Sequence, residues 1–137
     1  MALPTIGGGA QTGDGNTETV LFVQGAPAAI PAGSATITTT QLLGGMIAGS
    51  PGASAAAYTL PTVTLLEAAL TNAVRVGQAF DFSISNIDGN TSGVITLTAG
   101  TGWTLAGLAT LAAVAGTSGQ WRARKTGVGT WTAYRLS

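Results

Sequence analysis

The sequence predicts an all-β fold, an antiparallel β-sandwich of jelly-roll type with one short helix and an extended N-terminal arm. Three observations lead to this prediction. Glycine accounts for 21 of the 137 residues, about twice the average usage of roughly 7%, and threonine is abundant. The C-terminal part alternates apolar and polar positions in short runs that turn-forming residues separate. At least seven such runs, spaced by roughly ten residues, are typical of antiparallel sandwiches and barrels.

Residues 1–18 are predicted to form the arm and residues 19–137 the sandwich domain. The arm contains Gly7–Gly9 and Gly13–Asn16 and has too little apolar surface to offset the entropy lost on ordering. We therefore expect a neighbouring molecule to hold it. The contact residues expected in the arm are Leu3, Pro4, Ile6, Asp14 and Glu18.

Three strands are predicted in the first half of the domain. Thr19–Gln24 is a run of β-branched and aromatic residues, and Ala35–Thr38 and Ala55–Leu60 are shorter runs of the same kind. Between the first two, Pro27 and Pro31 predict an extended segment without helix.

Two short helical segments are expected. The spacing of Thr38 and Gln41 is that of a capping box and predicts one helical turn, which Gly44–Gly45 ends. A helix is predicted over about 62–71, with Thr64–Glu67 as its capping box. Its expected apolar face consists of Leu65, Leu66, Ala69 and Leu70.

The second half of the domain carries the clearest strand patterns. They are expected over 80–85, 94–98, 103–105, 108–114, 120–124 and 130–136, with turns at 86–90, 100–102 and 127–129. Trp131 and Tyr134 fall on opposite faces of the last strand, so one of the two is expected to be exposed. The predicted core residues are Phe80, Phe82, Ile84, Ile95, Leu97, Trp103, Leu105 and Trp121.

The composition argues against an enzyme. The chain has no histidine and no cysteine, and only 7% of its residues are charged, against roughly a quarter in an average domain. Zinc sites and histidine-based catalysis are therefore excluded. Asp81 and Asp88 are expected on a strand face and in a turn, which is a poor arrangement for a catalytic pair. We expect no catalytic residue, no metal site and no cofactor.

The few charges are unevenly distributed. All five acidic residues precede residue 90, and the net charge is zero, so no long-range field attracts nucleic acid. No apolar run is long enough to span a membrane. A surface with so little charge is expected to be covered in an assembly. Four of the five basic residues lie near the C-terminus and are predicted to form a strand face that contacts a neighbouring subunit: Arg122, Arg124, Lys125 and Arg135.

Several segments together have a familiar pattern. They are Thr-Gln-Leu-Leu-Gly-Gly-Met-Ile within 39–47, Tyr-Thr-Leu-Pro-Thr at 58–62, the run from Asn72 to Asn86, the run from Ile95 to Leu105, and the terminal Tyr-Arg-Leu at 134–136. This pattern resembles small β-sandwich virion proteins of tailed bacteriophages, in particular aquatic phages and cyanophages. It consists of hydrophobic and turn positions and contains no catalytic motif.

The resemblance implies a non-enzymatic head decoration (cement) protein on the outside of an icosahedral capsid. Its expected partners are the major capsid protein and further copies of itself, with a trimer favoured, and neither nucleic acid nor a membrane is expected. Two alternatives stay open. The first is a tail-fibre or receptor-binding module of the virion, and the second is a carbohydrate-binding β-sandwich domain.

Overall fold

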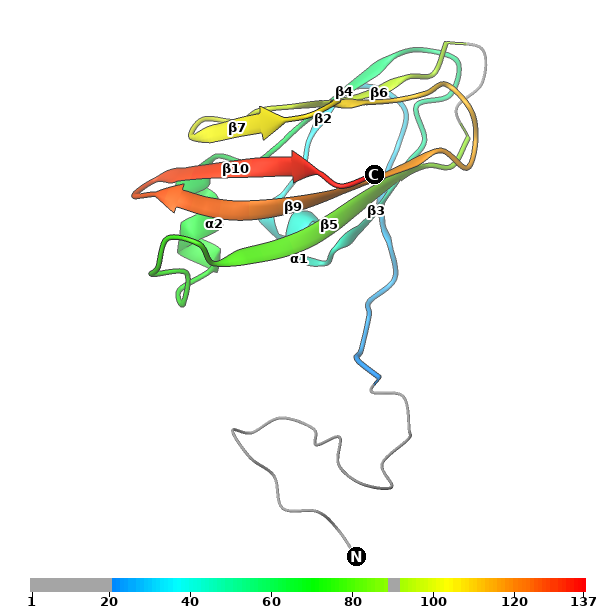
Figure 1. Ribbon diagram of the computed structural model, residues 1–137. Helices are drawn as coiled ribbons and strands as arrows, with labels where there is room; N and C mark the ends of the chain where they lie inside the picture. Colours follow the sequence, from blue (N-terminus) through cyan, green and yellow to red (C-terminus); the bar gives the residue numbers. More distant parts are fainter. Residues whose placement is uncertain (1–20, 89–91) are drawn as a thin grey trace, which may run out of the picture.

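A computed structural model describes residues 21–88 and 92–137. The predicted arm, residues 1–18, lies outside these residues. Strands account for 41% of the structure and helices for 11%, and the strands form two sheets. The strand-rich fold class is therefore confirmed, and Figure 1 shows its two layers.

The two sheets differ in size. The six-stranded sheet A has the order β1 (Ala28–Ile30), β3 (Met46–Gly49), β5 (Ala79–Asn86), β9 (Ser118–Gly127), β10 (Thr130–Arg135) and β7 (Trp103–Ala106). The four-stranded sheet B has the order β2 (Ala35–Thr36), β4 (Ala56–Thr59), β6 (Ile95–Thr98) and β8 (Thr110–Leu111). Two helices complete the described elements, α1 (Thr39–Leu43) and α2 (Val63–Ala69).

From β1 to β6 the chain winds as a coil. Each odd-numbered strand lies in sheet A and each even-numbered strand in sheet B, so the chain crosses between the layers after every strand. Consecutive strands within one layer are parallel: β1 pairs with β3, β3 with β5, β2 with β4, and β4 with β6. The opposite layer thus supplies the long connection that a parallel pair requires.

The C-terminal strands follow a different rule. Strand β9 is antiparallel to both β5 and β10, and β8 is antiparallel to β6, whereas β10 and β7 are parallel. The prediction of an antiparallel sandwich is therefore right for three of the eight pairings and wrong for the other five. A jelly roll, whose neighbouring strands are antiparallel, is not confirmed. The apolar alternation that supported the prediction indicates which face of a strand is buried but not which strand lies beside it.

The two helices begin at threonine caps. The capping box of Thr38 and Gln41 is present as predicted. The N-cap of α2 is Thr62, two residues before the predicted position, and its hydroxyl accepts a hydrogen bond from the Leu65 amide. The local apolar pattern does not decide which side of so short a helix is buried, because packing against the rest of the protein decides it. Val63 and Leu66 are buried, whereas the predicted inward residues Leu65 and Ala69 are exposed.

The first predicted strand is wrong for its described part. Residues 21–24 belong to no sheet, because strand propensity yields a strand only where a partner edge is available. Strands β1 and β3 were not predicted, since β1 lies between Pro27 and Pro31 and β3 follows the glycine pair after α1. The predicted strand over 108–114 shortens to β8.

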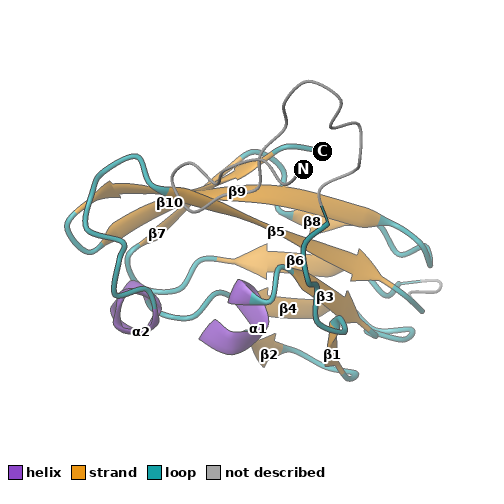
Figure 2. Ribbon diagram, turned by 90° about the horizontal axis from the view of Figure 1, so that it is seen from below, coloured by secondary structure: helices purple, strands orange, loops and turns teal. Residues whose placement is uncertain are grey.

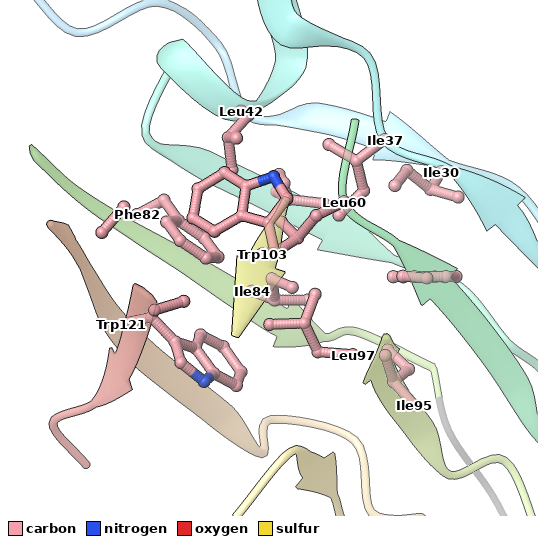
Figure 3. Packing of buried hydrophobic residues seen from close by; sticks show 14 of the residues in the cluster. Ile30, Ile37, Leu42, Leu60, Phe82, Ile84, Ile95, Leu97, Trp103 and Trp121 are labelled. Carbon is pink, nitrogen blue, oxygen red and sulfur yellow. The ribbon is translucent and has the colours of Figure 1, made fainter. Parts of the chain in front are cut away.

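One apolar cluster fills the space between the sheets (Figure 3). The Phe82 and Trp121 rings stack with centroids 5.6 Å apart. Trp103 Nε1 donates a hydrogen bond of 2.7 Å to the Pro61 carbonyl, which satisfies the indole. Six of the eight predicted core residues are buried, and Phe80 and Leu105 are partly buried against the same cluster. Further large members are Tyr58, Trp131, Ile37, Leu42, Leu60 and Leu66.

Candidate functional site

The charged side chains of the structure form no obvious chemical centre. Among residues 21–88 and 92–137, no three acidic, histidine or cysteine side chains gather where they can hold a metal ion. None of the helices in that part of the chain has the length and apolarity needed to cross a membrane.

One ion pair is partly buried and joins α2 to sheet A. Lys125 Nζ donates a hydrogen bond to Glu67 Oε1, and Trp131 Nε1 donates to the same oxygen at 3.1 Å. The Lys125 side chain is 8% exposed and its ammonium lies 5.8 Å from the centre of a Trp131 ring. Hydrogen bonds from Lys125 and then Trp131 hold the pKa of Glu67 below its ordinary range. Lys125 and Trp131 lie on sheet A and Glu67 lies on α2, so this pair connects the helix to the sheet.

The predicted basic strand face does not exist as one surface. Alternation along β9 places Arg122 and Arg124 outward but Lys125 inward. Arg122 forms a two-bonded ion pair with Asp81 on the neighbouring strand, at 2.7 and 2.9 Å, and this contact lowers the pKa of Asp81. Arg124 remains as the outward cation without an ion-pair partner among the described residues.

Arg135 connects the two sheets. Its guanidinium lies 4.6 Å from the centre of the Trp121 ring, and Nη1 donates to the carbonyls of Leu108 and Thr110. It thereby joins the end of sheet A to the edge strand of sheet B. Lys125, Arg122 and Arg135 thus all have partners within the subunit.

One long part of the chain contains no charged residue, although the Asp88 carboxylate contacts it by accepting a hydrogen bond from the Gly52 amide. Residues 19–66 contain no aspartate, glutamate, lysine or arginine. Their described part, residues 21–66, includes β1 to β4 and α1, which form one side of both sheets. We call this part the uncharged end. It includes exposed apolar side chains on α1 and β3, namely Leu43 and Met46, and one on α2, Leu65.

The most exposed apolar residues precede β1. Leu21, Phe22 and Val23, which we call the LFV segment, are 85%, 83% and 101% exposed. Figure 1 shows this stretch leaving the sandwich near β3. It is tethered by Gln24, whose amide Nε2 donates a hydrogen bond of 2.6 Å to the Gly44 carbonyl at the end of α1. Three consecutive large apolar side chains in water are unfavourable unless another surface covers them.

A groove opens at the carboxyl ends of the parallel strands of sheet B. Strands β2, β4 and β6 end in register at Thr36, Thr59 and Thr98. A second threonine follows three residues after each, giving the pattern Thr-x-x-Thr three times, at 36–39, 59–62 and 98–101. The groove has a volume of about 560 Å³, and its walls consist of Thr36, Ile37, Thr38, Thr39, Thr59, Leu60, Pro61, Thr62, Leu65, Ala99, Gly100 and Thr101.

The groove is neutral and mainly apolar. Several of its hydroxyls already have partners: those of Thr38 and Thr62 cap the helices, and that of Thr59 lies 2.7 Å from the Thr98 hydroxyl. Leu65 lines it from α2 with 58% of its surface exposed. Figure 2 shows the two helices as neighbours beside sheet B.

Gly100 brings two of the three loops into contact. A Cβ at this position would lie 2.2 Å from the Leu60 carbonyl oxygen, which is backbone and cannot turn away. The loop after β6 can therefore pack against the loop after β4 only with glycine here. This contact holds together the two loops, after β4 and after β6, that form one wall of the groove.

The sequence reasoning missed both parts of this candidate site. The arm contacts predicted at Leu3, Pro4, Ile6, Asp14 and Glu18 lie outside the described residues. Two signals for the site were present in the sequence: the charge-free run and the threefold Thr-x-x-Thr pattern. Nothing in the sequence indicated that Phe22 is exposed, because the β-branched and aromatic residues around it predicted a strand.

Comparison with family models, with curated proteins and with solved structures found no match to this chain. The resemblance to phage virion proteins therefore rests on the sequence pattern alone.

Proposed function

We propose that this chain is a non-enzymatic phage capsid decoration protein that binds the outside of an icosahedral head and stabilises contacts between capsomers. The observation that supports the proposal most is the uncharged end. A part of the chain that has no charged residue of its own and an exposed LFV segment is suited to being covered by other protein.

The physical demands on such a protein agree with these features. A decoration protein bridges neighbouring capsomers and needs many modest contacts repeated over symmetric copies, but it needs no reactive site. The ionisable groups of the core are used for packing, as in the contact of Glu67 with Lys125 and Trp131. In this proposal the partners are the major capsid protein and other copies of the chain, with a trimer favoured.

The carbohydrate-binding alternative receives little support. A sugar platform requires exposed aromatic rings, and the three tryptophans are at most 7% exposed. Tyr134 is the outward aromatic of β10, at 40% exposure, and has no aromatic neighbour among the ring contacts of the described residues.

The copy number in the virion separates decoration from a tail-fibre role. Purified virions are digested, and peptides of this chain are quantified against those of the major capsid protein with isotope-labelled standards. A decoration protein is expected in amounts comparable to the capsid protein. A few copies per particle would overturn the proposal in favour of the tail module, and absence from the virion would overturn both.

A further inference from the structure

We propose that the LFV segment of one copy occupies the Thr-x-x-Thr groove of a neighbouring copy, so that the chain associates head to tail. This inference deepens the self-association part of the proposed function and rests on it. It names the two surfaces that meet and the residues at their centre, Phe22 and Leu65.

The two surfaces are chemically matched. Neither contains a charged residue, and both consist mainly of apolar atoms. The groove of about 560 Å³ lies within the range of roughly 300–1,000 Å³ that accommodates compact ligands. Buried aromatic side chains dominate the energetics of most protein interfaces. We therefore assign Phe22 as the anchor, with Leu21 and Val23 beside it.

The segment does not reach the groove of its own chain. Its tether, the hydrogen bond from Gln24 to Gly44, lies at the C-terminal end of α1. The groove lies at the other end of α1, around Thr38 and Thr39. In this arrangement Phe22 remains 83% exposed, so the same subunit does not cover it.

Addition of the segment to the edge of sheet A is disfavoured. The Ile30 carbonyl accepts a hydrogen bond from the Ser50 amide, so Ile30 faces β3. By alternation, Pro27, Ala29 and Pro31 face the free edge of β1. Two of these three residues have no N–H group to donate, which blocks pairing with another strand. The groove is therefore the better receptor for the segment than this edge.

A contact between two different surfaces of the same chain is heterologous. Such contacts form closed rings when the rotation between copies closes and open chains when it does not. A ring of three copies is the closed form that agrees with the proposed trimer. The trimer itself is not required by the pairing of Phe22 with the groove.

Engineered cysteines test the pairing directly, because the native chain contains none. Two single variants, Val23→Cys and Leu65→Cys, which keep the anchor Phe22, are prepared with tags of different mass, mixed and oxidised. Both positions are exposed, so neither change disturbs the core. We expect the heterodimer of the two variants as the main product on a non-reducing gel. A disulfide forms only when the Cα atoms approach to about 4.4–6.8 Å. Disulfides only within each variant, or none, would overturn the proposal.

The double variant Val23→Cys/Leu65→Cys distinguishes the copies involved. Links between copies give a ladder of multimers or a covalent ring, whereas a link within one chain gives only monomer. A monomer product would overturn the proposal.

Light scattering of Phe22→Asp supplies a second measurement, with Val128→Asp as the matched control because Val128 is 97% exposed on the β9–β10 turn. We expect Phe22→Asp alone to reduce the oligomer mass; equal masses for both variants would contradict the proposal.

These results do not depend on the virion. A positive crosslink together with absence from the particle would refute the decoration role and leave the pairing intact. Failure to crosslink together with a high copy number in the virion would refute the pairing of Phe22 with the groove and leave the decoration role intact.

Discussion

The uncharged end and the C-terminal strands are built by different rules. In the uncharged end, short strands of two to four residues pair in parallel with strands from the next turn of the coil. In the C-terminal part, β5, β9 and β10 have six to ten residues, pair antiparallel and carry the ion pairs. The first region contains no charged residue and exposes the LFV segment, whereas the second contains the basic residues of both ion pairs, Arg122 and Lys125.

This difference indicates that the uncharged end has a role beyond packing the subunit. The long antiparallel strands carry the stack of Phe82 on Trp121, the ion pair of Asp81 with Arg122, and Lys125, whose partner Glu67 lies on α2. The uncharged end contributes a groove and the LFV segment, which have no use within one subunit. Both regions supply buried residues to the core, nine of the nineteen from the uncharged end. We infer that the uncharged end, in addition, holds subunits to their partners.

The largest expected effect lies in the antiparallel region. Phe82 is 1% exposed and stacks on Trp121, so Phe82→Ala should lower the free energy of unfolding by about 3–5 kcal/mol. Ser83→Ala on the outward face of the same strand is the control and should change it little. Urea denaturation measures both. Equal effects at the two positions would show that the buried face of β5 is misassigned.

The next effect tests the uncharged end. Gly100→Ala places a Cβ against the Leu60 carbonyl and should cost about 3 kcal/mol, as in other overpacked sites. Gly25→Ala, which meets no atom within 4 Å, is the matched control and should be nearly neutral. Thermal melting compares the two. A neutral Gly100→Ala would mean that the loops bordering the groove are not in contact.

A smaller effect concerns the ion pair between α2 and sheet A. Glu67→Gln leaves the ammonium of Lys125 without its counter-ion and should cost about 1–3 kcal/mol at neutral pH. The double variant Glu67→Gln/Lys125→Met should cost less than the sum of the single changes, because no uncompensated charge remains. Urea denaturation of the native chain, the two single variants and the double variant measures this coupling. Strictly additive losses in the free energy of unfolding would contradict the prediction.

The same pair predicts a dependence on pH. The pKa of Glu67 is lowered in the folded protein from its ordinary value of 4.5. Its contribution to stability is therefore complete above about pH 4.5 and is lost as the pH falls through the lower, folded pKa. Asp81 adds a smaller change of the same sign, since Arg122 lowers its pKa at an exposed site. Acid titration of Glu67→Gln should show a shallower loss of stability than the native chain; an unchanged curve would exclude Glu67 as its source.

The smallest effect is expected on the outward face of β9. Arg124 is exposed and forms no ion pair with another described residue. Arg124→Ala should therefore leave both the unfolding midpoint and the oligomer mass unchanged, as thermal melting and light scattering would reveal. A clear loss of oligomer mass would move the association surface from the uncharged end to β9.

Much of the inward face of the antiparallel strands could be predicted from the sequence. Alternation places Phe82, Ile84 and Trp121 inward, and the same rule, followed two residues further than Ala123, places Lys125 inward as well. The charge of Lys125 obscured this, because it suggested an exposed basic face. Its partner Glu67 lies 58 residues away in the chain, and no local pattern connects the two.

The uncharged end was less predictable for a physical reason. Strands such as β1 and β2 have two or three residues and exist because a strand from the next turn of the coil pairs with them. Local propensity does not encode that partner. The α1 capping box was predictable because all its hydrogen bonds lie within four residues, whereas the groove depends on three loops that only the coil brings together.

Hydrogen–deuterium exchange of the free protein, compared with the protein bound in the virion, tests most directly whether the uncharged end is the association surface. The measurement follows peptides from residues 21–66 and from β9 and β10 in both states. We predict that assembly slows exchange in the first set, most strongly around Phe22 and Thr36–Thr39, and leaves the second set unchanged. Slower exchange confined to β9 and β10, with residues 21–66 as open as in the free protein, would contradict this account.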